Sequence, residues 1–133
     1  MDKIKLQDNH RRSVSAAIYM IEKIIRDLEK ELRPDEEGVL LKIIHDINTT
    51  DLQHYEKVLL PIKSHIRYLA EKYGLNPHEV LISRLVNAKK TGMWEILCDT
   101  NSKRMKGYGD FPEEFARELD SDIDTLLNLI AEI

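Results

Sequence analysis

Two histidines, His54 and His65, come closest in this chain to the residue types and spacing of a metal site. They lie eleven residues apart. At about 3.6 residues per turn this is close to three helical turns, so both imidazoles would fall roughly on one side of a helix. A carboxylate-bridged site in a helical bundle also needs Glu-x-x-His motifs, and the sequence contains none. We therefore expect no metal and no cofactor, and we interpret both histidines as solvated side chains.

Cys98 is the single cysteine of the chain. A thiol acts as a nucleophile when a nearby base or positive charge lowers its pKa, and the helix neighbours Trp94 and Glu95 supply neither. We predict a buried and inert thiol, because free cysteine is among the most buried residue types. One cysteine also excludes an internal disulfide and a zinc site built from thiolates, which indicates a reducing compartment.

The most distinctive local feature is a basic loop that precedes a predicted helix N-terminus. Lys103, Arg104 and Lys106 come just before two glycines that flank Tyr108. Free amides at a helix N-terminus bind anions, so this loop could hold a phosphate or an acidic peptide. Acidic residues from Asp110 to Glu114 already place negative charge at that N-terminus, however. The second interpretation is a plain turn with a C-cap glycine.

The basic residues around this loop define an alternative function. The net charge of −4 argues against a dedicated duplex-binding protein, because neutralising phosphates needs a basic surface. Residues 80–107 nevertheless contain six basic residues and two acidic ones. Binding of nucleic acid or of a phosphate ligand through residues 84–109 is therefore our alternative hypothesis. The residues expected to carry it are Arg84, Lys89, Lys90, Lys103, Arg104, Lys106 and Tyr108.

The common signatures of enzymes are absent from the sequence. It has no P-loop, no dinucleotide-binding fingerprint, no Gly-x-Ser-x-Gly elbow and no His-Glu-x-x-His pair. This favours a non-enzymatic role, with a metal-dependent enzyme as the least favoured alternative. We hypothesise a helical module for protein–protein interaction or assembly.

Apolar residues recur every three or four positions through most of the chain, a pattern typical of amphipathic helices. We expect long helices over about residues 10–33, 50–73, 77–104 and 110–133. Short connections between them predict an all-α fold, an antiparallel four-helix bundle. One additional short helix is expected at about residues 36–47, where the apolar pattern also fits a strand.

Local signals predict where these helices begin, bend and end. Pro61 should interrupt its helix on the solvent side, and Gly74 should end it as a C-cap. Asn76-Pro77-His78-Glu79 has the composition of an N-cap followed by the first helical turn. Gly92 would let a neighbouring backbone approach closely, and Asp120 could act as a second N-cap that breaks the last helix.

Length and apolar content predict one domain, residues 1–133, with residues 1–8 as a flexible N-terminal tail. No window approaches the ~20 apolar residues of a membrane span and no signal peptide is evident, so we expect a cytoplasmic protein that does not bind membranes. Three apolar side chains lie outside the main apolar stripe of the helix over residues 50–73. We expect Val58, Leu60 and Tyr68 to meet a protein partner or a second copy in a homodimer.

Overall fold

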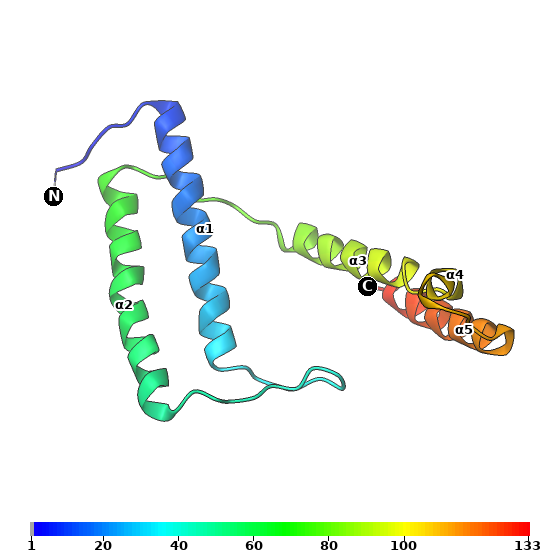
Figure 1. Ribbon diagram of the computed structural model, residues 1–133. Helices are drawn as coiled ribbons and strands as arrows, with labels where there is room; N and C mark the ends of the chain where they lie inside the picture. The colour runs from blue at the N-terminus through cyan, green and yellow to red at the C-terminus, as the bar shows by residue number, and fades with distance from the viewer. Residues whose placement is uncertain (1) are drawn as a thin grey trace. The chain divides into compact units, whose positions relative to one another are not determined.

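The computed structural model describes residues 2–133, and it confirms the expected all-α class (Figure 1). No strand occurs among those residues. The chain divides into two compact units, Met1–His78 and Glu79–Ile133. The helical elements are α1 (Asp8–Leu32), α2 (Thr49–Lys72), α3 (Ile82–Cys98), α4 (Ser102–Met105), the 3₁₀ helix η1 (Lys106–Tyr108) and α5 (Glu113–Ile130).

Helices α1 and α2 form an antiparallel hairpin (Figure 1). Its core consists of Ile25, Leu59 and Ile66, with Ile18 and Leu32 packed against them. The α1 members of this set repeat every seven residues, which is close to two helical turns and keeps them on one face. Burial of this stripe is therefore what holds the two helices together.

The two helices of the hairpin are staggered along their length. Arg33, the residue after the end of α1, already pairs with Glu56 of α2. The first turns of α2, from Thr49 to Tyr55, therefore project beyond the end of α1 (Figure 1).

Both ends of α2 are closed by specific hydrogen bonds. The Asn48 side chain accepts a 2.8 Å hydrogen bond from the backbone N–H of Asp51, so Asn48 is the N-cap and α2 begins at Thr49, one residue before the expected start. At the other end Gly74 has φ +58°, and the N–H of Leu75 donates to the carbonyl of Ala70. This is the expected glycine stop, because a left-handed residue lets the chain turn back onto the last carbonyls. Pro61 is exposed to solvent, as predicted, but α2 continues through it and is not interrupted there.

The additional short helix expected at residues 36–47 is wrong, and so is the strand considered there. Residues 33–48 form neither in the structure. The N–H of Gly38 donates to the carbonyl of Leu41, and the N–H of Ile43 donates to the Glu37 carboxylate. These bonds close a local turn. A helix of this length is marginal in water unless its apolar face packs against another element. Leu40 and Ile44, which would lie on that face, are 95% and 83% exposed, so no such packing is present.

The helix start expected at Pro77 is also wrong, because α3 begins only at Ile82. The intervening chain belongs to neither α2 nor α3. His78 instead stacks on Tyr19 of α1, with ring centroids 4.1 Å apart and an interplanar angle of 25°. This tertiary contact outweighs the local capping signal, since aromatic stacking adds to the burial of both rings.

In the second unit α3 and α5 pack together, and the side chains buried on α5 are Ala116 and Ile130. Polar contacts reinforce the packing. Asp120 accepts hydrogen bonds from the Ser102 N–H at 2.9 Å and from the Ser102 hydroxyl at 2.7 Å. Lys90 donates to the carbonyl oxygens of Ala131 and Ile133, both at 3.1 Å.

Two further expectations for this unit are corrected. Asp120 does not break the last helix, because its carboxylate is used by Ser102 and α5 runs on to Ile130. These two hydrogen bonds from Ser102 lower the pKa of Asp120 below its ordinary value. Gly92 marks no close helix crossing either, since a Cβ built there would meet no neighbouring atom within 4 Å.

Candidate docking surface

The hairpin α1–α2 has two long flanks beside its apolar core, and they differ in chemistry. On α1, Glu29 follows the buried Ile25 by four residues and Ile21 precedes it by four, so at about 100° per residue they lie on opposite sides of it. On α2, Leu59 lies between Ile62 and Lys63 on the helix surface for the same reason. Ion pairs then show which flanks of the two helices adjoin.

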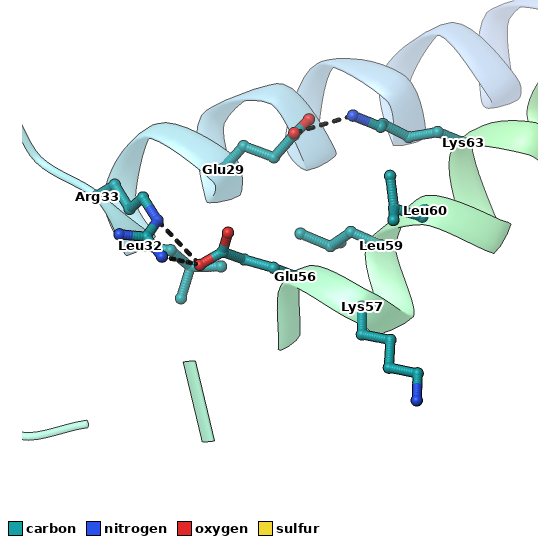
Figure 2. A pocket seen from close by; sticks show the side chains of 8 residues that line it. All are labelled: Glu29, Leu32, Arg33, Glu56, Lys57, Leu59, Leu60 and Lys63. Carbon is teal, nitrogen blue, oxygen red and sulfur yellow. Dashed lines mark hydrogen bonds and ion pairs between the residues drawn. The ribbon is translucent and has the colours of Figure 1, made fainter. Parts of the chain in front are cut away.

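One flank, here called the paired flank, is closed by ion pairs (Figure 2). Arg33 binds Glu56 through two nitrogens, Nη2 at 2.7 Å and Nε at 2.9 Å. Lys63 Nζ lies 3.0 Å from Glu29 Oε2. These side chains surround a pocket of about 310 Å³ whose apolar wall includes Leu59. Both carboxylates, those of Glu29 and Glu56, are paired with a base across the hairpin. The side chains around this pocket therefore hold the two helices together, and neither acid is free to act on a ligand.

The other flank, here called the open flank, is apolar, and no other part of the hairpin unit that the structure describes covers it. Its α1 side chains Ile21, Ile24 and Leu28 are exposed, with Ile24 at 59%. The α2 side chains next to them, Val58 and Ile62, are exposed as well, with Ile62 at 38%. Apolar side chains from two helices thus form one continuous surface. Contiguous apolar surface of this kind marks sites of protein–protein contact.

The sequence analysis did not separate these residues from the core stripe. A usable signal was present, because the apolar arc of α1 includes Met20 and Ile24 besides the seven-residue repeat that contains Ile25. One neighbouring helix covers only one stripe, so a wider arc indicates a second neighbour.

The three residues expected at an interface do not lie together. Val58 belongs to the open flank, whereas Leu60 lines the pocket of the paired flank. Tyr68 stacks on His65, with ring centroids 5.3 Å apart. All three are exposed, but they face different directions around α2.

The loop that joins α1 and α2 carries the most exposed apolar side chains of the hairpin unit. Val39 is 91% exposed and Leu40 is 95% exposed, and Leu41 and Ile44 are also in contact with solvent. An apolar run without a covering surface is typical of segments that become ordered when a partner binds.

The basic loop of the second unit forms a shallow hollow of about 990 Å³. Lys103, Arg104 and Tyr108 line it, as does Asp99, which pairs with Arg104 at 3.3 Å. Lys106 instead lies near Asp120 and contributes to its lowered pKa. The structure thus brings together three of the residues expected to bind an anion, one of them already paired with an acid.

The basic residues of α3 do not extend this hollow into a stripe. Arg84 and Lys89 are five positions apart, which separates them by roughly 140° around the helix. Lys90 is occupied by the carbonyl oxygens of Ala131 and Ile133. The seven residues named for nucleic-acid or phosphate binding therefore do not form one surface.

Cys98 is exposed, so the expectation of a buried thiol is wrong. It is the last residue of α3, next to Leu97, which is partly buried. Adjacent residues on a helix diverge by about 100°, so Cys98 turns toward solvent.

Metal-binding residue types do not cluster in the part of the chain that the structure describes: no three His, Cys, Asp or Glu side chains there could hold an ion together. Over the same residues, none of the helices is both long enough and apolar enough to span a bilayer. Comparison with family models, curated proteins and solved structures finds no match for this chain.

Proposed function

We propose that this protein is a non-enzymatic helical module that docks other helices on the open flank of its α1–α2 hairpin. The observation that carries the proposal is the contrast between the two flanks. Charged side chains of the paired flank satisfy one another, whereas the open flank leaves Ile21, Ile24 and Ile62 in water. Covering these side chains would be favourable by about 25 cal/mol for each Å² of apolar surface removed from water.

The antiparallel four-helix bundle expected from the sequence was a bundle within one chain; in this proposal the hairpin contributes two of the four helices. A hairpin supplies two adjacent helices whose apolar surfaces continue on one side, and two further helices complete a bundle with a shared core. The seven-residue spacing of Ile18, Ile25 and Leu32 suits the shallow crossing angles of such bundles. The single cysteine is compatible with action in a reducing compartment such as the cytoplasm.

Site-specific photo-crosslinking tests the docking surface. A benzophenone amino acid replaces Ile62 on the open flank or, as the matched control, Leu60, an exposed apolar residue of the same helix that lines the paired-flank pocket. Irradiation in the cells that make the protein should yield a discrete adduct from position 62 and little from position 60. Equal adduct formation at both positions, or none at position 62, would contradict the proposal.

A second candidate function is binding of a phosphate-bearing ligand in the hollow of the second unit. It is supported by the convergence of Lys103, Arg104 and Tyr108 on that hollow. Titration of the protein with inorganic phosphate, followed by amide shifts in NMR, should perturb these residues and weaken with added salt. Absence of shifts at low salt would rule this candidate out.

A further inference from the structure

We infer that the occupant of the open flank is a second copy of this chain, with α2 lying antiparallel against α2 of its partner across a two-fold axis. This inference rests on the docking function proposed above and names its partner. Two features of the hairpin support it: the width of the open flank and the charges along α2.

The width of the open flank calls for a partner that is two helices wide. The flank is built from both α1 and α2, whose lengths are 25 and 24 residues. A single docked helix would cover one groove and leave part of the apolar surface in water. A second hairpin presents two adjacent helices with the same apolar surface, as isologous association requires.

Charge placement along α2 selects the antiparallel orientation. Asp51, Val58, His65 and Lys72 repeat every seven residues beside the open flank, with the acid near the N-terminal end of α2 and the base near its C-terminal end. When two α2 helices lie antiparallel, each Asp51 meets Lys72 of the other copy, and Ile62 falls close to the axis. Charges at such flanking positions determine partner choice and orientation in helical assemblies.

The base at this position is held in place by its neighbours. Lys72 Nζ lies 5.4 Å from the centre of the Tyr68 ring and 5.7 Å from that of Tyr73. Asp51 is exposed, and it accepts a hydrogen bond from the Asn48 side chain at 3.1 Å. Asp51 and Lys72 thus each have a neighbour on their own chain, and within residues 2–133 neither is paired with an opposite charge.

Charge reversal tests the inference by analytical ultracentrifugation of the full chain. The wild type should sediment as a dimer at micromolar concentration. Asp51→Lys places lysines at all four positions and Lys72→Asp places acids there, so each variant alone should dissociate about tenfold more readily. An equimolar mixture of the two variants should recover wild-type association, because every contact then joins an acid to a base. Rescue that needs both variants cannot arise from a folding defect in either.

Glu71→Lys is the matched control, since it reverses a charge at the same end of α2 on a position that faces away from the open flank. It should leave the dimer unchanged. A wild type that remains monomeric up to millimolar concentration, or a mixture that associates no better than its components, would overturn the inference. The docking function would still stand if Ile62 crosslinked to a different protein in cells; loss of the position-62 adduct as well would remove both.

Discussion

Different interactions hold the helices together in the hairpin α1–α2 and in the unit that contains α3, α4 and α5. In the hairpin, a core of Ile25, Leu59 and Ile66 is flanked by ion pairs on one side only. In the second unit, hydrogen bonds to Asp120 and from Lys90 supplement a core with two buried side chains, both on α5. Both units leave large apolar side chains exposed, for example Ile24 in the hairpin and Ile82 and Ile96 in the second unit, so exposed apolar surface by itself does not single out the hairpin. What makes the open flank the candidate for association is its contrast with the ion-paired flank of the same hairpin.

The largest effect is expected from Ile25→Ala, which removes the centre of the hairpin core. Ile25 is 6% exposed, so the variant should lose about 2 kcal/mol or more of unfolding free energy. The matched control is Ile24→Ala, an exposed neighbour, which should change stability by less than about 0.5 kcal/mol. Urea denaturation followed by circular dichroism, at a dilution where the protein is a monomer, measures both. Similar losses would mean that Ile24 is covered within one chain.

A smaller effect, opposite in sign between the units, is expected at two glycines. Gly74→Ala should destabilise the hairpin by about 1 to 2 kcal/mol, because φ +58° strains any residue with a Cβ. Gly92→Ala should stabilise α3 by about 0.5 to 1 kcal/mol, because glycine weakens a helix interior. Neither new Cβ meets a neighbouring atom within 4 Å, so both effects are conformational. Thermal unfolding of the two variants measures both stability changes. Destabilisation by Gly92→Ala would show that another segment packs against position 92.

The smallest and pH-dependent effect is expected from Asp120→Asn in the second unit. Because the hydrogen bonds from Ser102 lower the pKa of Asp120 from 3.8, its carboxylate stabilises the fold above that pH. This contribution is lost as the pH falls below 3.8 and through the lowered value. Wild type should therefore exceed the variant in stability near neutrality and match it in strong acid. Fluorescence of Trp94, the only tryptophan, reports unfolding of this unit. A pH-independent difference would contradict the assignment.

Sequence periodicity was sufficient to place the hairpin helices. Ile18, Ile25 and Leu32 are spaced by seven, and Gly74 follows a helix as glycine commonly does, so α1 and α2 were located within two residues at each end. Both signals lie within or directly after the helices that they predict, so no contact with a distant part of the chain was needed to interpret them. The same periodicity rule failed at residues 36–47, where Leu40, Ile43 and Ile44 could share one helical face. In the structure Leu40 and Ile44 are 95% and 83% exposed, so no packing stabilises a helix there.

Contacts between residues distant in sequence account for two of the errors. The stacking of His78 on Tyr19 removed the helix start expected at Pro77, although the capping sequence was favourable. Asp120 was interpreted as a cap for its own helix, whereas its carboxylate oxygens accept hydrogen bonds from Ser102, eighteen residues earlier. The basic residues were grouped by their nearness in sequence, but a helix separates Arg84 from Lys89 around its axis.

The loop that connects α1 and α2 is longer than the stagger of the hairpin requires. The part of α2 that projects beyond α1, Thr49–Tyr55, is only about 10 Å long at roughly 1.5 Å per residue. Residues 33–48, fully extended, would reach about 50 Å at roughly 3.3 Å per residue. The loop between the helices can therefore be shortened or rearranged without displacing either helix.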